Sequence, residues 1–353
     1  MSTPSWLIYG ANGYTGELIA REAVARGMTP ILAGRNHDKV VRLANELRLP
    51  CKVFDLNSPE QVAKAIHGVK LVLLTAGPFS ATSAPMVDAC IRAGAHYLDI
   101  TGEIDVFEHI HQRDADARRS GVVLCPGVGF DVIPTDCVAA ALKKALPDAV
   151  SLSLGFDTTV SLSPGTLKTT LESMPQGGRV RRNGQLVRVP FAHEVKRIDF
   201  GRGERLATAV PWGDVSTAFH STGIGHITVF VPAPRLAIVG MKLGQLLLPL
   251  LRLPAVQRLL SAWVSKAVKG PDETARAQAP AYVWGEVVNA SGQRRTARVK
   301  TANGYSLTVP GALAVTSHLL SLREAPAGFT TPSRLMGPDL LSQLPGGGPI
   351  CIS

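Results

Sequence analysis

The sequence predicts an α/β protein, with a Rossmann-type doubly wound parallel sheet followed by a second α+β domain that carries an open mixed or antiparallel sheet. Three observations predict this fold. A short apolar run, residues 6–9, leads directly into a glycine-rich turn, residues 10–16. Apolar runs of strand length then alternate with segments of helical periodicity as far as residue 145. From residue 151 short alternating segments follow one another, and helical crossovers become rare.

The first predicted strand, residues 6–9, is uncharged and therefore suits a central strand buried on both faces. In the turn that follows, Gly10 permits a tight bend and Gly13 lets the backbone approach a pyrophosphate. Gly16 allows the next helix to lie close to the strand, and the N–H groups of that helix, with the hydroxyl of Thr15, would bind the phosphates. The spacing is G-x-x-G-x-x-G, which on its own is equally compatible with an ordinary turn.

The end of the second predicted strand indicates which dinucleotide would bind. An NAD site places an acidic residue there for the ribose 2′-hydroxyl, whereas this chain places Arg35, followed by Asn36. The planar guanidinium suits a 2′-phosphate, so the sequence predicts NADP(H). The alternative is that Arg35 is a solvated loop residue before the next helix.

The rest of the first domain follows the same alternation. The further predicted strands are 29–33, 51–54, 69–75, 96–100 and 122–125. The predicted helices after the first are 39–47, one that begins with the Ser58 cap and Pro59, then 84–93, 106–118 and 135–145. Six strands joined by helices predict a parallel sheet. The expected division is 1–147 for the NADP-binding domain, 148–309 for a substrate or dimerisation domain, and 310–353 for a helix and an extended tail that packs back on the body.

In the second domain the predicted strands are 151–156, 185–190, 227–231, 282–288 and 294–301. Asn303-Gly304 is a tight-turn signal, and it predicts a further strand over residues 305–309 before a helix over 309–322. A short helix is predicted over residues 163–174, where its N-terminus offers either a simple cap or an anion site.

Ligands of open α/β sheets lie at the carboxyl ends of the strands, so residues just past each strand are the candidate site. The predicted cofactor-binding residues are Gly10, Ala11, Asn12, Gly13, Tyr14, Thr15, Gly16, Arg35, Asn36, Asp55, Ala76, Gly77, Pro78, Phe79, Gly129 and Phe130. The candidate catalytic residues are Asp99, Glu103, Asp131 and His220. An acid beside a turn is as often a helix cap, and a histidine is more often hydrogen-bonded within a sheet. No residues have the spacing of metal ligands, so no metal is predicted.

The formal charge of +10 raises the question of nucleic acid as a partner. The basic residues are scattered and lack interleaved aromatic side chains, so a solvated basic face and a small-molecule substrate are expected, and nucleic acid is not. The five cysteines lack C-x-x-C spacing and are expected to be reduced. Only five residues precede the first strand, which with the cysteines predicts a cytoplasmic location.

Residues 238–268 are rich in leucine and contain several Lys and Arg, while Pro249 and Pro254 interrupt any single membrane-spanning helix. Basic amphipathic helices are expected there. Three roles stay open for them: a lid over the substrate cleft, the contact of a homodimer, or a face that rests peripherally on an anionic membrane.

Five segments together carry a family resemblance: residues 10–16, 32–36, 76–79, 97–103 and 126–136. In this order they resemble the saccharopine dehydrogenase-like oxidoreductase family, in particular its trans-acting enoyl reductase branch. The resemblance implies an NADP-binding domain and an α+β domain that closes over the nicotinamide, without implying saccharopine as the substrate. The expected function is an NADPH-dependent oxidoreductase that reduces an activated C=C or C=N bond of a small, fairly apolar substrate. The alternative is a non-catalytic NADP-binding or lipid-surface sensor or scaffold protein.

Overall fold

The computed structural model describes residues 5–158, 176–245, 253, 256 and 280–353. The chain divides into two compact units, and each is discontinuous in sequence. The first unit consists of Met1–Ile133 and Tyr305–Met336, and the second of Pro134–Gly304 and Gly337–Ser353.

The first unit contains a seven-stranded sheet in the order β15-β6-β5-β4-β1-β2-β3. All of its strand pairs are parallel, which confirms the predicted doubly wound sheet. The strands are β1 (Trp6–Tyr9), β2 (Ile31–Gly34), β3 (Cys51–Val53), β4 (Leu71–Leu74), β5 (His96–Asp99), β6 (Val123–Cys125) and β15 (Gly328–Phe329). The central strands β1 and β4 are buried along their whole length, as their uncharged sequences predict.

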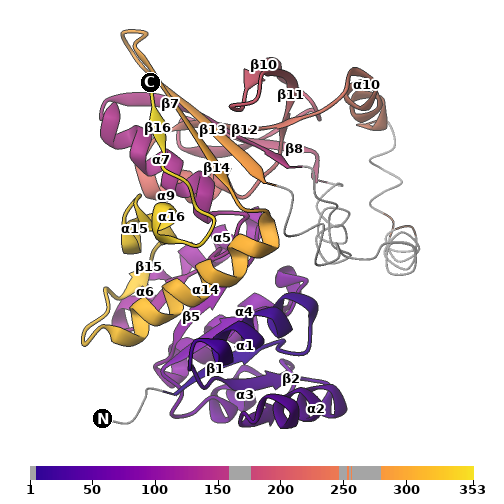
Figure 1. The fold of residues 1–353 in the computed structure, drawn as a ribbon, viewed down its shortest axis with the longest axis vertical. Coiled ribbons are helices and arrows are strands. Elements are labelled where there is room, and N and C mark those ends of the chain that lie inside the picture. The colour runs from indigo at the N-terminus through magenta and orange to yellow at the C-terminus, as the bar shows by residue number, and fades with distance from the viewer. Residues whose placement is uncertain (1–4, 159–175, 246–252, 254–255, 257–279) are drawn as a thin grey trace. The chain divides into compact units, whose positions relative to one another are not determined.

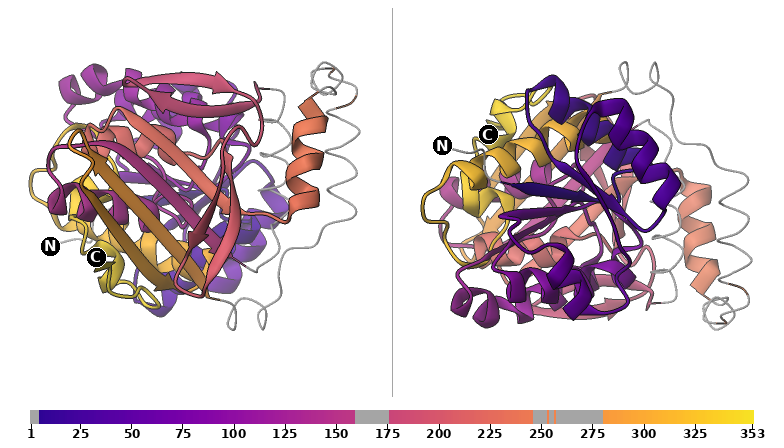
Figure 2. Two further views of the ribbon diagram at one scale, coloured as in Figure 1. Left: turned by 90° about the horizontal axis from the view of Figure 1, so that it is seen from above. Right: turned by 90° about the horizontal axis from the view of Figure 1, so that it is seen from below.

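Helices cover the sheet of the first unit on both faces (Figures 1 and 2). They are α1 (Tyr14–Ala25), α2 (His37–Leu47), α3 (Pro59–Ala65), α4 (Phe79–Ala93), α5 (Ile104–Gln112), α6 (Asp114–Arg119) and α14 (Gly304–Ser321), with the short α15 (Pro332–Met336) near the end. Helices α1 and α2 contact each other, whereas α3, α4 and α5 form a second contiguous group. This grouping follows from right-handed crossovers that start in opposite directions from β1 and β4.

Helix α14 corrects the predicted strand over residues 305–309, because those residues form its first turns. The Asn303-Gly304 signal marks the start of a helix instead of a hairpin. The ring of Tyr305 packs edge-on against that of Tyr14, with centroids 5.2 Å apart. At the other end the Ser317 hydroxyl lies 3.8 Å from the Met28 sulfur. Packing alongside α1 therefore overrides the strand propensity of the β-branched residues in this segment.

Two further helices differ from their predicted bounds. Helix α4 begins at Phe79, five residues before the predicted start, and it contains Pro85. The predicted helix 106–118 is divided into α5 and α6 at Arg113.

The second unit contains a mixed sheet with the strand path β10-β11-β12-β7-β13-β14-β16, and β8 and β9 extend it from β12. Its strands are β7 (Ala149–Thr158), β8 (Gly178–Arg182), β9 (Gln185–Val189), β10 (Val195–Asp199), β11 (Glu204–Val210), β12 (His226–Pro232), β13 (Ala281–Asn289), β14 (Arg294–Thr301) and β16 (Cys351–Ile352). Among the described strands of this second sheet, only β12 and β7 pair in parallel. The mixed sheet confirms the predicted fold class of this domain.

Three longer helices of the second unit are α7 (Ile133–Ala145), α9 (Asp214–Thr222) and α10 (Arg235–Gly244), and α16 (Leu340–Gln343) is a short one. Helix α7 packs directly on β13, where a Cβ on Gly285 would lie only 2.7 Å from Val138 and 2.8 Å from Leu142. Glycine at this position lets helix and sheet approach closely.

The observed division differs from the predicted segments 1–147, 148–309 and 310–353. Helix α7 lies almost entirely in the second unit, and α14 lies in the first. The tail after residue 328 supplies β15 to the first sheet and β16 to the second. Strand pairing and helix packing between distant segments decide to which unit each element belongs. The order of elements along the chain does not predict these contacts.

Two predicted helical regions fall wholly or mainly outside the described residues. The helix predicted over 163–174 lies outside them entirely. Of the region 238–268, helix α10 and the single positions 253 and 256 are described, and so is Gln245. Among the described residues no helix is both long enough and apolar enough to span a bilayer. Cys90, Cys125 and Cys137 are buried, whereas Cys51 and Cys351 are exposed.

Candidate functional site

The turn between β1 and α1 is fixed by backbone hydrogen bonds to the neighbouring strands of the first unit. The N–H of Gly10 donates to the carbonyl oxygen of Ala33 at 2.8 Å, and the N–H of Gly13 donates to that of Gly10 at 2.9 Å. Gly10 has φ +87°, and a Cβ there would lie 2.7 Å from the backbone nitrogen of Ala76. The turn therefore lies against the end of β4, and only glycine fits at position 10.

The N-terminus of α1 is not capped by a side chain of its N-cap residue. Its N-cap is Gly13, which has no side chain to accept a hydrogen bond. Helix α2 is capped by Asn36, whose side-chain oxygen accepts from the N–H of Lys39 at 3.0 Å. Helix α3 is capped in the same way by Ser58. The N-cap residue of α1 therefore leaves the positive dipole end of this helix without a capping side chain, at the carboxyl edge of the sheet.

The glycines at the strand ends divide into two kinds when the space around each is compared. Gly13 and Gly77 are exposed. A Cβ on Gly13 would meet only the carbonyl oxygen of Gly10, at 3.2 Å, and one on Gly77 would meet only the Phe79 ring, at 3.8 Å. These two positions leave room for a ligand to approach the backbone.

Gly127 and Gly129, by contrast, are buried, and the protein itself fills the space beside them. A Cβ on Gly127 would lie 2.6 Å from Val132, and one on Gly129 would lie 3.1 Å from Thr308. Gly129 was predicted to contact the cofactor, whereas packing within the first unit explains both glycines.

Thr308 on α14 holds the loop after β6 in place, and sequence reasoning missed it. Its Oγ1 accepts a hydrogen bond from the N–H of Phe130 at 3.0 Å. Tyr305, one turn earlier on α14, contacts Tyr14 at the start of α1. Helical spacing of the apolar residues from Leu307 onward was the available signal, but the strand prediction for 305–309 masked it.

Arg35 follows β2 and is exposed. Among the described residues its guanidinium forms no hydrogen bond or ion pair. Asn36 is engaged as the cap of α2. Asp55 follows β3, is exposed, and accepts a hydrogen bond from the N–H of Asn57 at 2.9 Å. The guanidinium of Arg35 is therefore available to a 2′-phosphate. The side-chain oxygen of Asn36, by contrast, already caps α2.

Asp99 is fully buried at the end of β5 and has several hydrogen-bond donors around it. Its carboxylate accepts from the Tyr97 hydroxyl at 2.7 Å, from the N–H of Thr101 at 3.0 Å and from the N–H of Gly127 at 2.8 Å. Burial raises the pKa of Asp99 to about 6, against the lowering effect of these hydrogen bonds. Asp99 thus joins the loops after β5 and β6, which is a positioning role.

Glu103 acts as a cap supplied from another part of the chain. Its two carboxylate oxygens accept from the N–H of Phe79 at 2.9 Å and from the N–H of Ser80 at 2.8 Å. These are the first residues of α4, so the end of this helix is already neutralised by a carboxylate. The peptide bond between Gly77 and Pro78, just before the helix, is cis.

Asp131 lies in the loop after β6, where its carboxyl group packs against Gly102 at the end of β5. Burial raises the pKa of Asp131 to about 6. The three candidate acids Asp99, Glu103 and Asp131 therefore lie around the ends of β5 and β6 in the first unit. His220, the fourth candidate, lies on α9 in the second unit.

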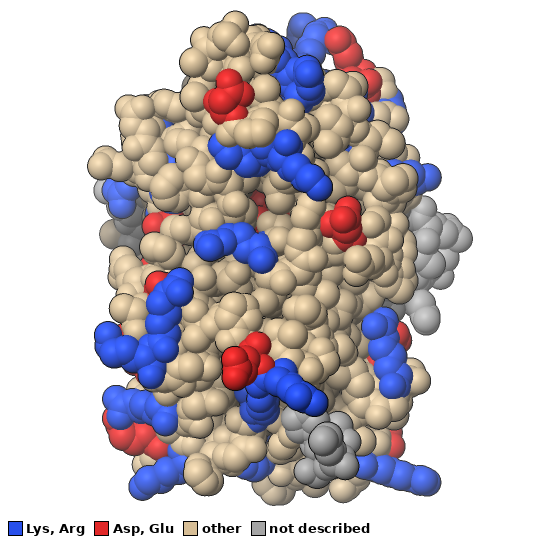
Figure 3. Space-filling model, turned by 90° about the vertical axis from the view of Figure 1, so that its left-hand side faces the viewer, with Lys and Arg blue, Asp and Glu red and all other residues tan. Residues whose placement is uncertain are grey.

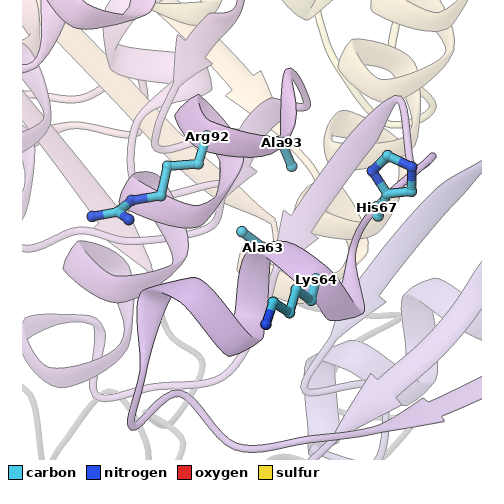
Figure 4. A pocket seen from close by; sticks show the side chains of 5 residues that line it. All are labelled: Ala63, Lys64, His67, Arg92 and Ala93. Carbon is cyan, nitrogen blue, oxygen red and sulfur yellow. The ribbon is translucent and has the colours of Figure 1, made fainter.

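One depression of the first unit lies away from these strand ends. It has a volume of about 410 Å³ and is lined by Ala63, Lys64, His67, Arg92 and Ala93 (Figure 4). These residues lie at the C-terminal ends of α3 and α4, hence at the opposite edge of the sheet. The polar side chains point apart in Figure 4, and Arg92 is paired with Glu60 at 2.8 Å.

Charged side chains are dispersed over the face shown in Figure 3, where Lys and Arg occur singly or in small groups with Asp and Glu between them. Within the described part of the chain, no group of three or more His, Cys, Asp or Glu side chains is arranged to hold a metal ion.

Comparison with known proteins agrees with this geometry. Residues 6–125 match the family model for the saccharopine dehydrogenase NADP binding domain, which confirms the NADP(H) prediction. Over 203 residues the chain is 32% identical to the trans-acting enoyl reductase of Mycobacterium tuberculosis, in an alignment that covers 52% of this chain and 48% of that relative. A probable mitochondrial saccharopine dehydrogenase-like oxidoreductase of Arabidopsis thaliana is 31% identical over 189 residues, covering 47% and 42%. The chain thus spans about half the length of the curated relatives it matches.

The fold extends the likeness beyond the matched domain. The solved structure of saccharopine dehydrogenase (L-Glu forming) from Saccharomyces cerevisiae matches 99% of both chains with a TM-score of 0.66, at 10% sequence identity. At this identity the match shows a shared fold and no more. Residues 6–125 of this protein therefore match the saccharopine dehydrogenase NADP binding domain, and the chain shares the fold of saccharopine dehydrogenase, as the resemblance of its motifs predicts.

Proposed function

We propose that this protein is an NADPH-dependent reductase that acts on an activated C=C or C=N bond of a small, fairly apolar substrate. One observation carries the proposal: the open N-terminus of α1 lies at the same sheet edge as Arg35, which is exposed and forms no ion pair among the described residues. The adjacent strands β1 and β2 end at these two positions. In Rossmann-type sites a helix N-terminus binds the pyrophosphate, and an arginine after the second strand accommodates the 2′-phosphate.

The residues that would hold the cofactor follow from this arrangement. The N–H groups at the start of α1 would bind the pyrophosphate, and the exposed backbone of Gly13 would let it approach. The exposed Gly77 after β4 would line the path of the nicotinamide half. When bound, NADPH supplies the hydride. Because the carboxylate of Glu103 caps the N-terminus of α4, the phosphates would bind at the N-terminus of α1 in preference to that of α4.

Two observations bear on the substrate and on the proton. Relatives at about 32% identity bear the name trans-acting enoyl reductase, which favours a C=C bond over a C=N bond. Among the candidate acids of the first unit, Glu103 has both carboxylate oxygens on backbone N–H groups and Asp99 is fully buried. Asp131 keeps part of its surface exposed, although burial of its carboxyl group raises its pKa to about 6, close to neutral pH. We assign Asp131 as the first proton donor to test.

The test is NADPH consumption by the whole protein with a panel of enoyl thioesters, enones and cyclic imines. The proposal expects turnover with at least one class, and Arg35→Ala should raise the KM for NADPH with little change in kcat. Asp131→Asn should lower kcat and remove a titration near pH 6 from its profile. Tight NADPH binding without oxidation by any member of the panel would favour the alternative, a non-catalytic NADP-binding sensor or scaffold.

A second role, peripheral contact with a lipid surface, is favoured by helix α10. Leu236, Val239 and Leu243 are 86%, 52% and 62% exposed and follow helical spacing along one face. Arg235 and Lys242 belong to the same helix, and the sequence from residue 215 to 271 contains no Asp or Glu. An exposed apolar stripe with basic residues and no acids matches an anionic bilayer surface.

Vesicle flotation tests this second role. The whole protein should float with phosphatidylglycerol vesicles at low salt and much less with phosphatidylcholine vesicles. The triple variant Leu236→Gln, Val239→Gln and Leu243→Gln should stay at the bottom of the gradient. Val187→Gln, which alters an exposed valine on β9, is the matched control. Absence of flotation with either lipid would remove the membrane role.

The cytoplasmic location and the homodimer stay predictions, and light scattering of the purified protein tests the homodimer.

A further inference from the structure

Tyr14, the first residue of α1, carries an exposed aromatic ring beside the glycine-rich turn. It is 43% exposed, and no other aromatic side chain among the described residues is exposed to this degree. The N–H groups of the first turn of a helix have no acceptor within the helix, and under the proposed function those of α1 would bind the pyrophosphate. The ring of Tyr14 is therefore within one side-chain length of the place where the pyrophosphate would bind.

The contact of Tyr14 with α14 shows toward which side of the turn its ring points. It packs edge-on against the ring of Tyr305, with centroids 5.2 Å apart and planes at 86°. Three positions further along α14, the hydroxyl oxygen of Thr308 accepts a hydrogen bond from the N–H of Phe130 at 3.0 Å. Residues three positions apart lie on one face of a helix, so a single face of α14 contacts both the start of α1 and the loop after β6.

The strand order of the first sheet relates this direction to the two halves of a dinucleotide. Strands β4, β5 and β6 lie on one side of β1, and β2 and β3 lie on the other. The adenosine half belongs to the side of β2, where Arg35 follows the strand, so the nicotinamide half would extend over the end of β4. Because α14 reaches the loop after β6, the Tyr14 ring that it contacts lies on the nicotinamide side of the turn.

We propose that Tyr14 and Tyr305 form a wall against which the nicotinamide half of NADPH packs. Tyr14 would touch the cofactor, and Tyr305 is a positioning residue that fixes the orientation of the Tyr14 ring. The reduced nicotinamide is uncharged, and an aromatic ring offers it a flat apolar surface. The inference rests on the proposed function, and it assigns a cofactor role to a helix outside residues 6–125, the matched domain.

Calorimetric titration of the whole protein tests the proposal, with NADPH and with adenosine 2′,5′-bisphosphate, which lacks the nicotinamide half. Tyr14→Leu and Tyr305→Leu should each weaken NADPH by at least about fivefold, while the affinity for the bisphosphate changes by less than about twofold. Tyr305→Phe keeps the ring pair and should bind NADPH like the wild type. The matched control is His111→Leu, which removes an edge-on ring pair with Phe329, at 5.1 Å, from the C-terminal end of α5. It should leave both affinities unchanged.

The fluorescence of bound NADPH gives a second readout that does not depend on turnover. A nicotinamide ring held against a protein surface reorients slowly, so its emission should show high anisotropy when NADPH is bound to the wild type. At saturating protein the anisotropy should fall in both leucine variants and be restored in Tyr305→Phe. Circular dichroism should show the same fold for every variant.

The outcomes separate this inference from the proposed function. If the wild type binds NADPH and both leucine variants keep its affinity and its anisotropy, NADP(H) binding stands and the inference is overturned. If the leucine variants weaken NADPH and the bisphosphate equally, the ring pair supports the turn and not the nicotinamide, and the inference is again overturned. If the wild type binds neither ligand, both the inference and the proposed function are overturned.

Discussion

The carboxylate of Glu103 accepts a hydrogen bond at 2.9 Å from the backbone N–H of Phe79, the first residue of α4. Its second oxygen accepts from the N–H of Ser80 at 2.8 Å. An acid from the loop after β5 therefore closes a helix that starts after β4, while the N-cap residue of α1 offers no side chain. Under the proposed function, this contrast would favour α1 over α4 as the helix that binds the phosphates.

Removing the Glu103 carboxylate should destabilise the protein without weakening cofactor binding. Glu103→Ala leaves the N–H groups of Phe79 and Ser80 without their acceptor, and the free energy of unfolding should fall by about 1–2 kcal/mol. Glu103→Gln keeps one side-chain oxygen, so its free energy of unfolding should lie between those of the wild type and Glu103→Ala. Urea unfolding measures the change, and titration with NADPH measures the affinity. An alanine variant as stable as the wild type would show that the cap contributes nothing.

Alanine at Gly129 and at Gly77 should have opposite effects. In Gly129→Ala the new methyl group would lie 3.1 Å from Thr308, so overpacking should lower the free energy of unfolding by about 1–3 kcal/mol. In Gly77→Ala the methyl group meets only the Phe79 ring at 3.8 Å, so stability should change little, while NADPH should bind more weakly. Thermal unfolding and titration on both variants decide the matter. Equal stability of the two variants would contradict the assignment of Gly129 to packing.

The pH dependence of stability should reveal the buried carboxyl of Asp99. Its pKa rises from 3.8 in the unfolded chain to about 6 in the fold, so the folded state holds the proton more tightly. The resulting stabilisation is fully present below about pH 4 and is lost as the pH rises to about 6. Compared with Asp99→Asn, the wild type should therefore be relatively more stable at pH 4 than at pH 7.

Urea unfolding of both proteins across this pH range gives the difference directly. Other titrating groups, such as His96, whose pKa burial lowers to about 4, contribute equally to both proteins and cancel. A difference in unfolding free energy that stays constant from pH 4 to pH 7 would contradict a raised pKa for Asp99.

Much of the first unit could be predicted from local sequence. The uncharged strand 6–9, the glycine turn after it and the Ser58-Pro59 helix start are local signals, and β1, α1 and α3 occur where these signals place them. Arg35 was identified from its distance along the chain from the glycine turn, because the length of one helix and two strands fixes that interval.

The features that escaped prediction depend on contacts between distant segments. Residues 305–309 have the β-branched composition of a strand, and only packing alongside α1 makes them helical. The glycine at position 129 is required by Thr308, which is 179 positions away in the sequence, so local reasoning assigned it to the ligand. Glu103 was a candidate proton donor because the sequence does not show that α4 begins at Phe79, beside its carboxylate.

The central claim is that the open end of α1 and Arg35 bind NADP(H). The most direct measurement is the equilibrium dissociation constant of NADPH and of NADH for the wild-type protein and for Arg35→Ala. NADPH should bind the wild type at least about tenfold more tightly than NADH, about 1.4 kcal/mol. Arg35→Ala should lose most of that difference while its affinity for NADH is retained. Equal affinities for the two dinucleotides, unchanged by Arg35→Ala, would contradict the account.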